Sequence, residues 1–127
     1  MELALHPNEL LLFYDGSSQT GKETLAFAQS VSSHINQKDL NTTHMTKNIW
    51  QELLTMVDLR PKEILNKSHP DYQEKIKGRS FTMDNWLEVL VHNPHLIKAP
   101  IAVMNKKALL CINPKEVLKL SPMIVSQ

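Results

Sequence analysis

The chain has 127 residues, of which 42% are apolar, and its 14 basic and 13 acidic side chains leave a formal net charge of +1. This length predicts one domain over residues 1–127, and the elements predicted below place its core over about residues 9–120. The near-neutral charge gives no electrostatic signal for nucleic acid, and no apolar run reaches the ~18–20 residues that cross a bilayer.

The first predicted element is a strand over residues 9–15, "ELLLFYD". Its unbroken apolar run is typical of a strand that is buried on both faces. Hydroxyl side chains follow that can cap a helix, and apolar residues at helical spacing predict that this helix runs to about His34. Residues 39–45 alternate loosely, which predicts a second, weaker strand.

A helical segment follows these elements. Thr46 and Thr82 each precede an amphipathic pattern, so we expect them to be the N-caps of two helices. Pro61 suits the first turn of a short helix, and residues 69–78, "HPDYQEKIKG", predict another that ends at a glycine.

The C-terminal part predicts a β-hairpin over residues 99–113, "APIAVMNKKALLCIN", and Pro114 then opens a short helix. The chain therefore begins with β-α-β and ends with β-β-α. This order predicts an α/β fold of the thioredoxin-like type, in which a small mixed sheet carries an inserted helical segment.

The loop after the first strand almost matches the phosphate-binding pattern G-x-x-x-x-G-K-[ST]. Gly16, Gly21 and Lys22 have the required spacing, but Glu23 stands where Ser or Thr would hold magnesium. A carboxylate at that point would face the phosphates, so we interpret the spacing as accidental.

The stretch "NPHLIKAPI" resembles the arsenate reductase/Spx family, whose pattern there is N-P-x-L-I-x-R-P-I. Upstream, "ILNKSHPDYQE" resembles that family's L-L-R-T…Y-K-E segment, and the resemblance covers about residues 10–120. The matching residues are Asn93, Pro94, Leu96, Ile97, Pro100, Ile101, Ile64, Leu65, Lys67 and Tyr72.

The resemblance implies that the catalytic loop of the family falls on residues 13–22, where the family reads Y-x-N-P-x-C-S-x-S-R. Ser18 then stands in the position of the nucleophilic cysteine, and Gly21 in the position of the second cysteine of the C-x-x-C variant. A serine hydroxyl cannot cycle through a disulfide, so the thiol chemistry of the family is lost at this position.

The resemblance also implies three arginines that bind the oxyanion and stabilise the thiolate. Their positions fall on Asn66, Ala99 and Asn113. Other cations that lie nearby in the sequence are Lys98, Lys22 and Arg60. These could compensate in part, but a solvated surface position is the ordinary role of such side chains.

The single cysteine, Cys111, can form no disulfide within the chain. It lies in the predicted second strand of the hairpin, where a small buried hydrophobic residue is the favoured interpretation over a redox thiol. The N-terminal residues do not resemble a signal peptide, and together with the single cysteine this predicts a cytoplasmic protein.

Two further features are candidate sites. Residues 17–22 begin the first helix and could be a vestigial anion site, or a turn capped by its own hydroxyls. The members of this candidate site are Ser17, Ser18, Gln19, Thr20, Gly21 and Lys22. The resemblance also implies that Pro100 is a cis proline facing this loop.

The six histidines predict no metal site, because the pair His92 and His95 is separated by the helix-breaking Pro94 and lacks a third ligand. No cofactor is expected either. We therefore expect a non-catalytic family member that acts as an interaction or regulatory module with an unidentified protein partner. Two alternatives stay open: a glutaredoxin- or glutathione-linked reductase with other thiol chemistry, and an Spx-like regulator associated with transcription.

Overall fold

The computed structural model describes residues 7–121 and contains, within that range, a sheet of four strands in the order β2-β1-β3-β4. These are β1 (Glu9–Tyr14), β2 (His34–Asp39), β3 (Ile101–Met104) and β4 (Lys107–Leu110). β1 pairs in parallel with β2 and antiparallel with β3, and β3 forms the hairpin with β4. The predicted mixed sheet with a terminal hairpin is therefore confirmed.

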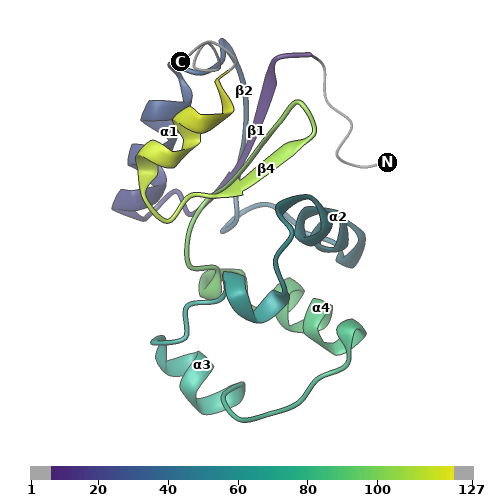
Figure 1. Ribbon diagram of the computed structural model, residues 1–127. Coiled ribbons are helices and arrows are strands. Elements are labelled where there is room, and N and C mark those ends of the chain that lie inside the picture. The colour runs from purple at the N-terminus through teal and green to yellow at the C-terminus, as the bar shows by residue number, and fades with distance from the viewer. Residues whose placement is uncertain (1–6, 122–127) are drawn as a thin grey trace.

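Helices cover both faces of this sheet (Figure 1). The α-helices are α1 (Gln19–Ala28), α2 (Lys47–Val57), α3 (Pro70–Lys75) and α4 (Met83–His92), and the 3₁₀ helices are η1 (Pro61–Ile64), η2 (Pro94–Leu96) and η3 (Pro114–Leu120). Thr46 and Thr82 cap α2 and α4 as predicted. Between residues 7 and 121, no helix has the length and apolar character needed to cross a membrane.

The central strand β1 is buried on both faces, which explains its unbroken apolar sequence. Leu10 and Leu12 belong to one hydrophobic cluster, which is closed by α1 and η3. Leu11 and Phe13 point to the opposite face and belong to a second cluster, formed with the inserted helical segment. Figure 1 shows α1 and the C-terminal η3 together on one side of the sheet, with α2, α3 and α4 away from them.

The prediction for residues 29–45 was wrong in two respects. α1 ends at Ala28 rather than near His34, because the Ala28 carbonyl accepts hydrogen bonds from the Val31 and Ser32 amides and turns the chain. The Ser32 hydroxyl also donates to the carbonyl of Asn8, which ties the turn to the start of β1. The second strand is His34–Asp39, so it shares only Asp39 with the predicted residues 39–45.

The prediction that Pro100 is cis was also wrong, because every peptide bond among the described residues is trans. The trans form is favoured by about 0.5–1 kcal/mol for an X-Pro bond. Pro100 directly precedes β3, where its missing amide breaks no pair of the sheet, and its carbonyl accepts a hydrogen bond from the Cys111 amide at 2.7 Å.

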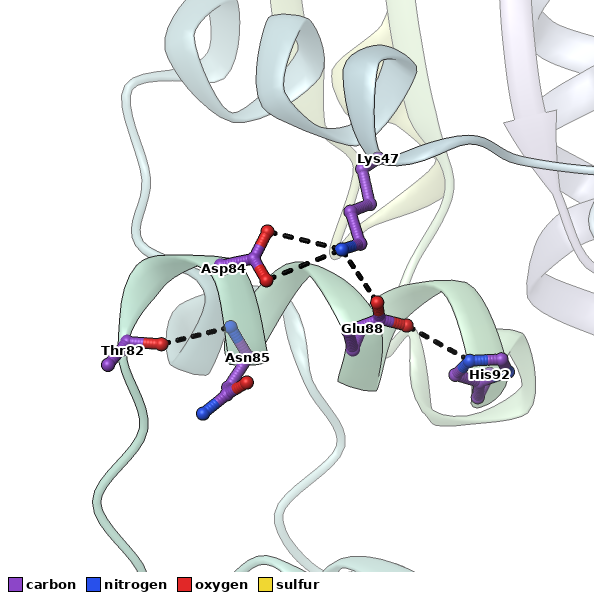
Figure 2. A network of polar contacts seen from close by, with 6 residues as sticks. All are labelled: Lys47, Thr82, Asp84, Asn85, Glu88 and His92. Atoms are coloured by element: carbon purple, nitrogen blue, oxygen red, sulfur yellow. Dashed lines mark hydrogen bonds and ion pairs between the residues drawn. The ribbon is translucent and has the colours of Figure 1, made fainter.

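A polar network joins α2 to α4 (Figure 2). The Lys47 ammonium lies 3.1 Å from an Asp84 oxygen and 2.6 Å from a Glu88 oxygen, and the second Glu88 oxygen lies 3.1 Å from His92 Nε2. The hydrogen bond from Lys47 is the main reason that the pKa of Glu88 is lowered. Beneath this network the two helices pack through apolar residues that include Trp50 and Leu90.

We expect Lys47→Met to lower the stability of the protein modestly, because it leaves two carboxylates without their shared cation. The loss is largest above the ordinary pKa of glutamate and vanishes as the pH falls through the lowered pKa of Glu88. It also shrinks in high salt, since the pair is solvent-accessible. Denaturant midpoints in low and high salt measure this, with the exposed Lys77→Met as control. Equal midpoint shifts in the two variants would contradict the prediction.

Candidate functional site

The loop between β1 and α1 is held as a capped turn. The Ser18 hydroxyl accepts a hydrogen bond from the Gly21 amide at 2.8 Å and donates to the Asp15 carbonyl at 3.1 Å. The Lys22 amide donates to the Ser18 carbonyl and the Ser18 amide to the Asp15 carbonyl. Ser18 is therefore the N-cap of α1, and its hydroxyl is engaged in holding the loop.

Two carboxylates converge on this loop from the ends of the parallel strands β1 and β2. Asp15 accepts hydrogen bonds from the Ser17 amide at 2.9 Å and the Ser17 hydroxyl at 2.6 Å. Asp39 accepts from the Gly16 amide at 3.2 Å, and the Asn41 side chain donates to both carboxylates at 2.7 and 3.0 Å. Donors that could hold an oxyanion are thus occupied by the protein's own anions.

These bonds keep the loop negative. The hydrogen bond from the Ser17 hydroxyl is the main reason that the pKa of Asp15 is lowered, so this carboxylate is ionised at neutral pH. A negative charge beside the N-terminus of α1 uses the favourable end of the helix dipole. A bound anion would have to displace it or tolerate its repulsion.

The loop borders a small cleft of about 130 Å³. The cleft is lined by Asp15, Ser18, Thr20, Leu40, Asn41, Pro94, His95, Ile97, Lys98, Ala99 and Pro100. Of the three cations considered from the sequence, Lys98, Lys22 and Arg60, it is Lys98 that lines this cleft. Arg60 is the residue just before η1 and pairs with Glu63 at 3.7 Å, and neither Arg60 nor Lys22 lines this cleft.

The three positions implied for arginines are not all at the cleft. Ala99 lines it together with Ser18. Asn66 instead accepts hydrogen bonds from the Ser68 amide and hydroxyl, which shapes the turn before α3. Asn113 caps η3 and contributes to a different surface, near Glu23 of α1.

Most backbone amides of the candidate anion site over residues 17–22 already donate hydrogen bonds within the loop. The amides of Ser17, Ser18, Gly21 and Lys22 all donate to oxygens of the loop itself. Within the described chain this leaves the first-turn amides of Gln19 and Thr20 outside the cap. The residues predicted for the site do lie together, but weak anion binding there stays a prediction.

Cys111 lies just beyond the end of β4 rather than inside that strand, and it is fully buried. Burial is the main cause that raises the pKa of its thiol to about 12. The thiolate is the reactive form, so the raised pKa and the burial both disfavour reaction of this thiol at neutral pH in the folded protein. The structure thus agrees with its interpretation as a small core residue.

The histidines are arranged differently from the expectation. His92 pairs with Glu88 on α4, whereas His95 turns away from it to Asp71, with 2.8 Å between His95 Nε2 and an Asp71 oxygen. His69 lies beside the same pair, with its ring centroid 5.3 Å from that of His95. His34 and His44 are exposed, and His6 lies outside the described residues. One hint in the sequence was missed, namely the close spacing of His69 and Asp71.

Comparison with known proteins relates the chain to one family. The ArsC family model matches residues 13–120. The regulatory protein MgsR of Bacillus subtilis (strain 168) is 28% identical over 113 residues, which is 87% of this chain and 90% of MgsR. An arsenate reductase from Vibrio cholerae superposes with a TM-score of 0.81 at 19% identity, covering 91% of this chain and 99% of that one. A candidate arsenate reductase from Yersinia pestis superposes with a TM-score of 0.74 at 24% identity, covering 87% of this chain and 98% of that one. These likenesses show the thioredoxin-like fold.

Proposed function

This chain belongs to the ArsC family, and from that premise we propose that it is a non-catalytic member that works as an interaction or regulatory protein. The observation that carries the proposal is the engagement of Ser18. Where the resemblance places a nucleophilic thiol, a hydroxyl caps α1 and donates to the Asp15 carbonyl. The one thiol of the chain, that of Cys111, is fully buried and has a raised pKa.

The regulatory form of this proposal is supported by one relative. MgsR is a regulatory protein, and its 28% identity extends over most of both chains. The enzymatic alternative is a reductase that works through Cys111. This alternative predicts that the unaltered protein reduces arsenate with glutathione and glutaredoxin, and that Cys111→Ser abolishes this turnover.

The surface that best fits a protein partner is a groove of about 530 Å³ beside η1 and the start of α4. Its basic and aromatic lining consists of Arg60, Lys62, Lys67, Arg79, Phe81 and Trp86. Glu63 is the acidic residue in the lining, and it pairs with Arg60. The groove therefore carries an excess of positive charge.

Apolar side chains in the groove give a partner something to pack against. The Phe81 and Trp86 rings lie 4.6 Å apart between centroids, and the Arg79 guanidinium lies 5.3 Å from the Phe81 ring. Met83 is 49% exposed at the same place. Charge complementarity indicates an acidic protein segment with an apolar anchor as the occupant.

We expect the double variant Lys67→Glu/Arg79→Glu to lose at least tenfold in capture of the partner, since two favourable charges become repulsive. The experiment is affinity capture from nuclease-treated lysate of the native organism, followed by mass spectrometry. The control is Lys106→Glu/Lys107→Glu, which reverses two charges at the exposed β3–β4 turn. The assignment of this surface would be overturned if the partner is captured only from lysate without nuclease treatment, or if both double variants lose capture equally.

A further inference from the structure

Three side chains with metal-binding atoms meet beside the cleft. His69 is the N-cap of α3, Asp71 lies in the first turn of that helix, and His95 belongs to η2. One ligand atom from each lies within 4.8 Å of the other two. His95 also lines the cleft that Ser18 borders, so the cluster adjoins it.

The fold brings these residues together through backbone bonds between distant segments. Leu65 and Ile97 form an isolated antiparallel bridge. The Asn66 amide donates to the Leu96 carbonyl at 2.7 Å, and the Lys98 amide donates to the Ile64 carbonyl at 2.9 Å. The start of α3 and the η2 turn are therefore fixed relative to each other, which pre-organises the cluster.

From this geometry we propose that His69, Asp71 and His95 bind a divalent transition-metal ion of the Zn²⁺ type. Two imidazoles and a carboxylate are ligands that Zn²⁺ accepts, and a fourth position is left for water or a small ligand. The proposal does not depend on the function proposed above.

The present spacing is near that of a tetrahedral ion. Bonds of about 2.0–2.1 Å place the ligand atoms about 3.3 Å apart. The pair His95 and Asp71, now at 2.8 Å, opens slightly, and the widest separation, at most 4.8 Å, closes. His95 is exposed and the other two side chains are half-buried, so side-chain rotation can make this adjustment.

Binding also exchanges one interaction for another. His69 Nδ1 accepts a hydrogen bond from the Asp71 amide at 3.0 Å, which caps α3. Coordination through Nδ1 displaces that amide, and coordination through Nε2 places the ring proton on Nδ1, where it faces the amide hydrogen. In either case the cap at Asp71 is released, so the backbone amide of Asp71 reports metal binding directly.

The test is titration of the untagged, EDTA-treated full chain with ZnCl₂ by calorimetry and by amide NMR. We expect one ion per chain and a shifted Asp71 amide. Co²⁺ adds a spectroscopic signature, since a tetrahedral site gives intense visible absorption. His95→Gln keeps a hydrogen-bonding partner for Asp71, and His69→Asn keeps an N-cap acceptor.

Each of these two variants is expected to bind at least tenfold more weakly, whereas His92→Gln, which alters the histidine paired with Glu88, leaves the affinity unchanged. Circular dichroism verifies that the variants are folded. The proposal is overturned by an absence of saturable binding up to about 1 mM ZnCl₂, by an unshifted Asp71 amide, or by a His92→Gln effect equal to the others.

Discussion

We expect the replacement of Ser18 by cysteine to create a reactive thiol but not an arsenate reductase. The new thiol lies at the N-terminus of α1, where the helix dipole and first-turn amides lower the pKa of a cysteine. Reduction also requires the substrate to be held. Each charge-assisted hydrogen bond contributes about 1.5–3 kcal/mol, and of the three positions that the resemblance implies for arginines only Ala99 lines the cleft. Each such bond that is missing there removes roughly one to two powers of ten in affinity.

The carboxylates at the loop act in the same direction. Asp15 lines the cleft and is ionised, and Asp39 holds the Gly16 amide from the neighbouring strand. An arsenate oxyanion brought to the Ser18 position would meet this negative charge without the compensating cations. Lys98 is the cation that lines the cleft, and it is exposed to solvent.

The measurement compares alkylation with turnover. We expect Ser18→Cys to react with iodoacetamide, whereas the buried Cys111 of the unaltered protein reacts only on unfolding, which makes the unaltered chain the blank. Turnover is followed with arsenate, glutathione and glutaredoxin, with an active arsenate reductase as positive control. Turnover by Ser18→Cys within tenfold of that enzyme would refute the claim that the pocket is dismantled.

A matched pair of double variants sharpens the test. Ala99 lines the cleft with Ser18, whereas Asn113 lies on a different surface near α1. Ser18→Cys/Ala99→Arg is therefore expected to gain arsenate binding over Ser18→Cys, and Ser18→Cys/Asn113→Arg is not. A gain in both would mean that added charge alone, rather than its position, governs binding.

The strong local signals of the sequence were sufficient for most of the fold. β1 is an uninterrupted apolar run because it is buried on both faces, and the hairpin turn is marked by polar residues between two apolar runs. β2 could not be found in this way. Its sequence, "HINQKD", belongs to a half-exposed edge strand without apolar alternation, so its pairing with β1 defines it.

The candidate site was predictable only in part, for a similar reason. Ser18 could be placed at the helix start from its local sequence and the family resemblance. The approach of Asp39 to Gly16 depends on the parallel register of β1 and β2, which no local pattern encodes. The meeting of His69 and His95 depends on the bridge between Leu65 and Ile97, a contact between segments far apart in the chain.

The close packing around Gly21 also stands against a cysteine at this position, and we expect a substitution of Gly21 to destabilise the fold. A Cβ atom at this position would overlap the backbone carbonyl oxygen of Asp15 and lie 2.8 Å from the Ser18 hydroxyl. Both contacts belong to the capped turn, and the first is with backbone, which cannot rotate away. In a helix, replacing glycine by alanine ordinarily stabilises by about 0.5–1 kcal/mol. Here we expect a loss of about 1–3 kcal/mol from overpacking.

Because the expected loss of stability is opposite in sign to the usual effect of replacing glycine by alanine in a helix, its measurement tests the overlap directly. Gly21→Ala and Gly21→Cys are compared with Ala26→Cys, an exposed position of the same helix, by chemical denaturation followed by circular dichroism. A Gly21→Ala protein as stable as the unaltered chain would contradict the overlap. If both Gly21 variants are destabilised and Ala26→Cys is not, the C-x-x-C pair cannot be rebuilt by exchanging Ser18 and Gly21 alone. The loop would first have to release the Asp15 carbonyl, so the loss of the dithiol is built into the backbone of the turn as well as into its side chains.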